Sequence, residues 1–187
     1  MTISIKWADA TLEKYQKEIV QLSARFPKVI PQEINKVGDR VRTQVVRTLT
    51  KQTGLPKKTI QKAVVTYGAS PGKYLYTLKS EGGDIRLRFF KPRETRKGVV
   101  AKPWGRPTTY PGTFMRGGKF PRRVESAYLS PDVWRRLNKS GTKITQQRSG
   151  VRIPVEMITG ATGDAFDKMA GPLLEQRVMK VIQKLLK

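Results

Sequence analysis

The sequence predicts a single α+β domain, with helices near both ends of the chain and short strands between them. Apolar residues recur at three- and four-residue steps near both ends, which is the spacing of an amphipathic helix. From Val64 onward, β-branched and aromatic residues alternate with polar ones, as is typical of strands. We therefore expect a helical start over 1–62, a sheet over 63–158 and a carboxyl-terminal helix over 159–187.

The helical start divides at its prolines. Asp9 is placed to cap a first helix that ends near Arg25. Pro27 and Pro31 then punctuate the chain, and a second apolar stripe runs from there to Gly54, a typical helix stop. The members of that stripe are Ile34, Val37, Val41, Val45 and Leu49. Its other face carries Arg40, Arg47 and Lys51 close to one line, and these could contact either a polyanion or only solvent. A short helix is expected to follow Pro56 and to end at Lys62.

The middle of the chain predicts strands joined by turns. Residues 73–79 and 84–90 flank a Ser-Glu-Gly-Gly turn at 80–83, which favours a hairpin. In that hairpin the core side would carry Ile85, Leu87 and Phe89, and the opposite side Arg86 and Arg88. Further short strands are expected within 124–129 and 143–158, where Pro154 suggests an edge position or a strand start.

Residues 91–123 differ in composition from everything around them. They hold five Pro, five Gly and ten Lys or Arg, with Glu94 as their single acid. Seven interspersed apolar side chains, among them Trp104 and Phe120, supply anchors that a plain solvated linker does not need. We expect a long extended arm or hairpin here, ordered by neighbouring subunits.

The carboxyl-terminal helix is predicted from residue 162 by an apolar stripe at Leu174, Val178, Val181, Ile182 and Leu185. Because proline damages a helix interior but fits its first turn, Gly171-Pro172 should kink this helix or restart it.

Charge and composition exclude many enzyme classes. The 187 residues contain 38 Lys plus Arg and 14 Asp plus Glu, a formal net charge of +24, and no His or Cys. Without imidazole or thiol there is no Ser-His-Asp triad, no Cys-His nucleophile and no zinc site of the usual kind. The excess charge is central, because residues 1–35 and 153–187 each hold five basic and four acidic side chains. Residues 86–152 hold eighteen basic and three acidic ones, a density that indicates a phosphate-rich partner.

Two apparent motifs have simpler explanations. Residues 112–119 resemble a phosphate-binding loop, but the spacing fails by one residue and Phe120 stands where a hydroxyl should bind magnesium. Asp164 and Asp167, with Glu175, could form the magnesium site of a nuclease. Acids favoured by the dipole at a helix amino terminus explain them better. We therefore predict no enzyme activity, no metal and no cofactor.

Aromatic residues mixed with charge, as in 74–76 and 86–90, could be stacking platforms for single strands or simply sheet core. No zinc-finger, homeodomain or RNA-recognition signature occurs, so contact with phosphates without sequence readout is what remains.

Several spaced patterns resemble the minor tail protein Z family of long-tailed phages and prophages, over about residues 25–187. They are IPQEINKV at 30–37 leading to TGL at 53–55, IRLRFFKPRETRKGV at 85–99, RIPV at 152–155 with ITG at 158–160, and the carboxyl-terminal helix. The resemblance implies helices packed on a small antiparallel sheet and a structural virion protein of the tail and neck, assembled in the host cytoplasm. It also implies a tail-completion ring of six copies that joins the tail tube end to the head.

The partners implied are other copies of the chain, a tail terminator or tail tube protein, a head-completion or connector protein, and viral double-stranded DNA, with no membrane. We predict that polyanion contact falls to the basic side chains of the arm: Arg93, Arg96, Lys97, Lys102, Arg106, Arg116, Lys119, Arg122 and Arg123. Alternatives from the same residues are a free nucleic-acid-binding protein of ribosomal or nucleoid type and, less favoured, the magnesium-dependent nuclease.

Overall fold

A computed structural model describes residues 2–5 and 26–185 of the chain. It confirms the α+β class, with long helices at both ends of the described main segment and three small antiparallel sheets. The predicted helix over 9–25 lies outside the described residues. No helix within 26–185 combines the length and the apolar run that crossing a bilayer requires.

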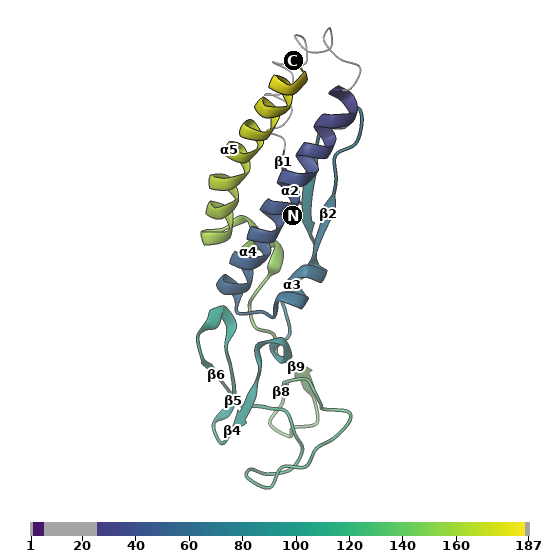
Figure 1. Cartoon of the computed structure of the whole chain (residues 1–187). Coiled ribbons are helices and arrows are strands. Elements are labelled where there is room, and N and C mark those ends of the chain that lie inside the picture. Colours follow the sequence, from purple (N-terminus) through teal and green to yellow (C-terminus); the bar gives the residue numbers. More distant parts are fainter. Residues whose placement is uncertain (1, 6–25, 186–187) are drawn as a thin grey trace.

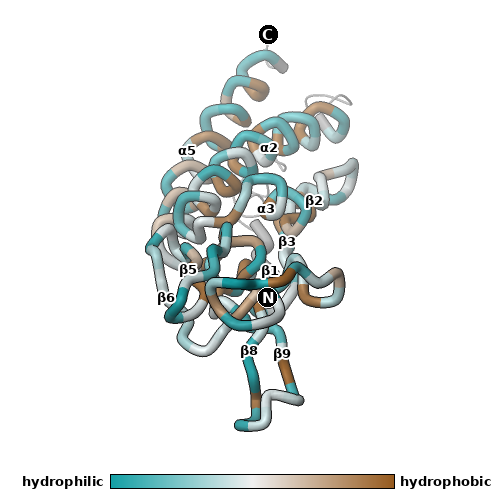
Figure 2. Tube along the Cα trace, turned by 90° about the horizontal axis from the view of Figure 1, so that it is seen from below, coloured by the Kyte–Doolittle hydropathy of each residue, from teal (hydrophilic) through white to brown (hydrophobic). Residues whose placement is uncertain are grey.

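Two long helices form one side of the molecule. Helix α2 (Phe26–Thr53) and helix α5 (Gly160–Leu185) lie side by side, with the carboxyl end of α5 near the amino end of α2 (Figure 1). Along both, hydrophilic and hydrophobic residues alternate from turn to turn, as amphipathic helices require (Figure 2). The whole predicted stripe of α2 is buried, and Gly54 follows the helix with φ at +75°, which confirms the predicted stop.

Both helices tolerate prolines that we expected to interrupt them. Helix α2 begins at Phe26 and includes Pro27 and Pro31, so the prediction that the helix follows these prolines was wrong. Pro27 falls in the first turn, where a helix needs no N–H donor. Helix α5 continues past Pro172, which is exposed, as one helix and does not restart there.

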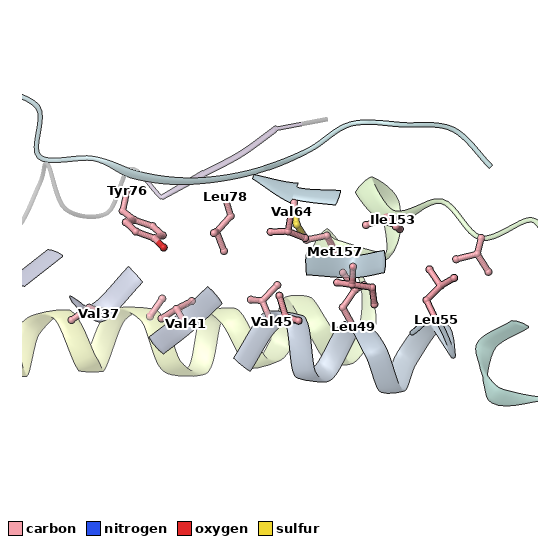
Figure 3. Packing of buried hydrophobic residues seen from close by; sticks show 14 of the residues in the cluster. Val37, Val41, Val45, Leu49, Leu55, Val64, Tyr76, Leu78, Ile153 and Met157 are labelled. Atoms are coloured by element: carbon pink, nitrogen blue, oxygen red, sulfur yellow. The ribbon is translucent and has the colours of Figure 1, made fainter. Parts of the chain in front are cut away.

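The first sheet has the strand order β1-β3-β2, with β1 at Thr2–Ile5, β2 at Val64–Tyr67 and β3 at Tyr76–Ser80. The short helix α3 (Lys57–Ala63) precedes β2, as predicted. The inner face of the sheet packs on α2, with Tyr76 and Leu78 facing Val37 and Val41 (Figure 3). Gly38 permits this approach, because a Cβ there would overlap the ring of Tyr76.

A fourth helix corrects a predicted strand. Residues 153–158 form helix α4 (Ile153–Ile158), not a strand, and Pro154 occupies its first turn. Ile153 and Met157 bury their side chains in the same core as α2 (Figure 3). We call β1 with residues 26–85 and 153–185 the body.

Residues 86–152, which we call the basic lobe, lie beyond the end of α2 that carries Thr53, away from the carboxyl terminus (Figure 1). A meander of β4 (Arg93–Thr95), β5 (Gly98–Ala101) and β6 (Thr108–Pro111) forms one sheet. The second consists of β7 (Thr113–Phe114), β8 (Trp134–Arg136) and β9 (Ile144–Gln146). The predicted arm over 91–123 is thus organised largely by its own strands.

Two predicted strands in this region are absent. Residues 87–90 form a 3₁₀ turn, η1 (Leu87–Phe90), so the hairpin with residues 73–79 was wrong. Leu87 is fully buried as expected, whereas Ile85 and Phe89 are only partly buried and Phe90 is buried in their place. Residues 124–129 form no strand: Val124 makes an isolated bridge with Gly117, and residues 127–129 belong to a turn.

The chain enters and leaves the basic lobe at one place. The amide of Ile85 donates to the carbonyl of Val151 at 2.9 Å, and the amide of Ser149 donates to the carbonyl of Ile85, also at 2.9 Å. An isolated bridge joins Arg86 to Arg148 next to these bonds. The two connecting segments are therefore paired with each other.

A polar network also links the basic lobe to the body. The indole N–H of Trp104, in the turn η2 (Pro103–Gly105), donates to one carboxylate oxygen of Glu156 at 2.7 Å. The amide of Gln52 donates to the other oxygen of Glu156 at 2.7 Å. The amide oxygen of Gln52 accepts from the backbone N–H of Thr162 at 3.0 Å and from its hydroxyl at 2.7 Å. One side chain of α2 thus ties together α4, the start of α5 and the lobe.

Candidate nucleic-acid interface

All three acids of the basic lobe are used in ion pairs inside the lobe. Glu94 pairs with Arg123 at 3.0 Å and Glu125 with Arg116 at 2.8 Å. Asp132 lies 3.4 Å from the guanidinium of Arg86 and 3.5 Å from that of Arg88. Of the eighteen basic side chains over 86–152, fourteen therefore have no acidic partner within the described residues. The lobe presents a strongly positive surface that it does not neutralise itself.

The turn between β4 and β5 places two of these side chains, Arg96 and Lys97, on the surface. Gly98 follows with φ at +133°, and a Cβ there would overlap the carbonyl of Tyr110 on β6. The hydroxyl of Thr113 donates to the same carbonyl at 2.6 Å and accepts from the amide of Val99 at 3.1 Å. The turn is thus fixed by close backbone packing behind it.

A hollow of about 590 Å³ opens on one side of this turn. Basic side chains surround it, and Phe120, whose side chain is 45% exposed, forms part of its wall. Glu94 also lines it, but its charge is offset by Arg123. The lining residues are Lys91, Arg93, Glu94, Thr95, Arg96, Val100, Lys102 and Phe120.

A second hollow of about 260 Å³ adjoins the first, because Thr95 and Arg96 line both. Its other basic residues are Lys97, Arg123 and Arg136. The guanidinium of Arg136 lies over the ring of Phe114, 5.2 Å from its centroid, which restricts the orientation of that side chain. No acid lines this hollow, so its electrostatic character is cationic throughout.

The predicted contact residues divide into groups. The two hollows bring together Arg93, Arg96, Lys97, Lys102 and Arg123. The other four line neither hollow: Arg106 follows η2, Arg116 is paired with Glu125, and Lys119 and Arg122 lie exposed in the turns between β7 and β8.

Arg123 is held by the protein more firmly than its neighbours. Its side chain is 19% exposed and contacts Glu94 as well as the carbonyls of Arg116 and Gly118. This guanidinium therefore joins the turn region after β7 to strand β4. Its charge is largely neutralised by Glu94 within the lobe.

Sequence reasoning missed two basic residues that line the hollows, Lys91 and Arg136. Lys91 directly precedes the predicted set and could have been included on proximity alone. Arg136 comes from β8, which reaches the site through its antiparallel pairing with β7. No local pattern in the sequence predicts that pairing.

The charge of the lobe comes from Lys and Arg. Burial, followed by the nearby carboxylate of Asp84, raises the pKa of Tyr110 on β6 above the ordinary tyrosine value. The neutral phenol is therefore favoured, and this ring adds no negative charge beside the hollows at physiological pH.

The acids considered for a nuclease lie elsewhere. Asp164, Asp167 and Glu175 are exposed on α5, and no group of three acids in the described ranges 2–5 and 26–185 is arranged to hold a metal ion. Residues 112–119 contain strand β7 and a bend, not the loop and helix of a nucleotide-binding motif.

Comparison with protein-family models, with curated proteins and with solved structures found no match for this chain.

Proposed function

We propose that this chain is a structural phage virion protein, a tail-completion or neck ring component that contacts the DNA end without reading sequence. The observation that carries the proposal is the division of charge. The body holds fifteen basic and eight acidic side chains, whereas the lobe holds eighteen basic and three acidic ones. In the lobe every acid is already paired, and fourteen basic side chains lack an acidic partner within the described residues. Such a surface favours a polyanionic partner.

The arrangement suits contact with a phosphate backbone. Four basic side chains gather around β4 and β5, two strands fixed by backbone hydrogen bonds. Arg93 lies on β4, Arg96 and Lys97 form the turn between the strands, and Lys102 follows β5. Lys and Arg at the surface of a rigid element neutralise phosphates but carry no base-reading geometry by themselves. Arg123, the fifth predicted residue at the hollows, pairs with Glu94 inside the lobe. We therefore assign phosphate contact first to Arg93, Arg96, Lys97 and Lys102.

The place of this surface in a virion follows from the resemblance to the tail protein family and from charge. In a ring of six copies, lobes turned towards the channel would surround the DNA end, and the bodies would form contacts between copies. Basic side chains not used for DNA would meet acidic surfaces of the tail terminator, tail tube protein or head connector, where opposite charge speeds docking.

The virion assignment is tested by mass spectrometry of gradient-purified particles from cells that carry the gene. We expect a handful of copies per particle, and separate filled heads and finished tails when a stop codon interrupts the gene. Recovery of the chain only on ribosomes or cellular DNA would establish the free nucleic-acid-binding alternative instead.

The DNA contact is tested by the salt dependence of binding to a blunt duplex. Replacing Arg93, Arg96, Lys97 and Lys102 with Ala should reduce the slope of log K against log salt by about 0.9 for each phosphate that the variant no longer neutralises. The matched control removes the same charge from exposed positions of the body, at Lys57, Lys58, Lys62 and Lys73. Equal slopes for the two variants would show that the lobe makes no localised DNA contact.

A further inference from the structure

We propose that the two hollows of the basic lobe form one site for an unstacked nucleotide of a single-stranded nucleic acid. The base would lie against Phe120 in the first hollow, and its phosphate among Arg96, Lys97 and Arg136 in the second. The inference rests on the polyanion contact proposed above and deepens it, because it assigns a single-strand preference to a particular place.

The first hollow has the size and wall of a base-binding site. Its volume of about 590 Å³ falls in the range of pockets that hold small organic molecules. Phe120 is 45% exposed, so its ring does not serve the core, and it lines a hollow that also contains Val100. Base stacking on an exposed aromatic ring is the main sequence-tolerant contact of single-strand binding proteins.

The charges around that hollow fit the backbone of a strand that enters it. Lys91, Arg93 and Lys102 line it and have no acidic partner among the described residues. Glu94, the only acid on the wall, is 3.0 Å from Arg123 and so does not oppose a phosphate with a free charge. An uncharged apolar ligand would gain nothing from these cations.

The second hollow is matched to the phosphate itself. It is smaller, about 260 Å³, and Arg96, Lys97 and Arg136 reach it from two different sheets of the lobe. Because Arg96 lines both hollows, a group in one lies next to a group in the other, as a base and its own phosphate do.

A duplex cannot use the site in the same way. Its bases are stacked and paired inside the helix, and extracting one costs a few kcal/mol. The site should therefore distinguish single strands from duplex through Phe120, while the cations contribute to both.

The test is fluorescence anisotropy of the full chain with a labelled oligo-dT of about ten nucleotides and with a blunt duplex of equal length. Phe120→Ala should weaken single-strand binding roughly fivefold or more and leave duplex binding within about twofold. Phe120→Tyr should restore stacking, and Phe120→Leu, which keeps apolar volume without a π face, should behave as Phe120→Ala. The matched control is Leu137→Ala, another exposed apolar residue of the lobe, which should change neither affinity.

A second pair of variants tests the phosphate position. Arg96→Ala with Lys97→Ala should weaken oligo-dT binding several-fold more than Lys139→Ala with Lys143→Ala, which removes the same charge from exposed positions outside both hollows.

Three results would overturn the inference. The first is that Phe120→Ala binds single strands as tightly as the wild type does. The second is that Phe120→Ala weakens single-strand binding and duplex binding by the same factor. The third is tighter Phe120-dependent binding of a poly-glutamate peptide, which would identify an acidic protein segment as the occupant. In the first two cases, duplex binding that still depends on salt would support the proposed DNA contact even though the single-strand site is excluded. If the chain binds no nucleic acid at all, both the DNA contact and the single-strand site are excluded.

Discussion

The body and the basic lobe are stabilised in different ways. Among the described residues, nineteen buried apolar side chains belong to the body, and the lobe contributes seven. The lobe also carries more exposed large apolar residues, namely Trp104, Phe120, Val124, Tyr128 and Leu137. The lobe is stabilised by short strands, ion pairs and turn glycines, whereas the body is stabilised mainly by the burial of apolar side chains. The difference indicates that stability is concentrated in the body, whereas the ligand contact that we propose lies in the lobe.

The largest effect is expected from a cavity in the body. Leu49 on α2 is fully buried, so Leu49→Ala should lower the free energy of unfolding by about 2 to 5 kcal/mol in urea titrations. Leu137→Ala in the lobe, at a side chain 63% exposed, should change it by less than about 0.5 kcal/mol. Similar losses for the two variants would contradict the division of roles.

The next effect concerns the approach of α2 to β3. A Cβ at Gly38 would overlap the ring of Tyr76, and relieving that overlap outweighs the helix propensity gained from Ala. Gly38→Ala should therefore destabilise the fold by about 1 to 3 kcal/mol, measured by urea unfolding followed by circular dichroism. The control is Gly171→Ala on α5, where a Cβ would meet open space and stability should change by less than about 1 kcal/mol.

The link between the two parts is tested by paired tryptophan variants. Trp104→Phe removes the indole N–H that bonds Glu156 of the body, and Trp134→Phe removes one that bonds the carbonyl of Leu129 within the lobe. Each should cost about 1 kcal/mol. Only Trp104→Phe should speed amide exchange in η2 and at the start of α5 together, because Glu156 connects them through Gln52. Identical exchange patterns would show that the network does not couple lobe and body.

The smallest effect is a pH dependence within the body. Burial, with a hydrogen bond to Asp39 at 2.8 Å, raises the pKa of Tyr76. The neutral phenol is thus favoured in the folded state, and its stabilisation is complete below the ordinary tyrosine pKa of about 10. It is lost as pH rises from there towards the higher folded pKa.

Tyr76→Phe should therefore cost about 0.5 to 1.5 kcal/mol at pH 7. The difference from the wild type should shrink as unfolding is measured at increasing pH above 10. A difference that stays constant across this range would mean that the phenol is not held neutral by the fold.

The body was largely predictable from sequence because its signals are local. The stripe of α2 from Ile34 to Leu49 and that of α5 from Leu174 to Ile182 are buried as their spacing predicts. Proline was misread twice in the same way, because Pro31 lies inside α2 and Pro154 lies in the first turn of α4, where no helix was expected to include them. A proline restricts its own φ and removes one donor, and packing against the core then decides whether a helix surrounds it.

The lobe was less predictable because its contacts join distant segments. Residues 85–90 alternate as a strand would, yet Ile85 pairs with segments near 149–151 over only a few bonds and the chain then turns. The ion pair of Glu94 with Arg123 and the position of Arg136 depend in the same way on strand pairing across the lobe. Composition predicted where positive charge is dense, but not which side chains share a hollow.

The paired segments where the lobe begins and ends give it the geometry of an inserted module. Ile85 and Val151 are joined by a backbone hydrogen bond of 2.9 Å, so a short turn could close the body at that point. Evolution can then lengthen, shorten or exchange everything between these residues and leave the helical framework in place. Related chains would be expected to share a body and to diverge in the inserted segment.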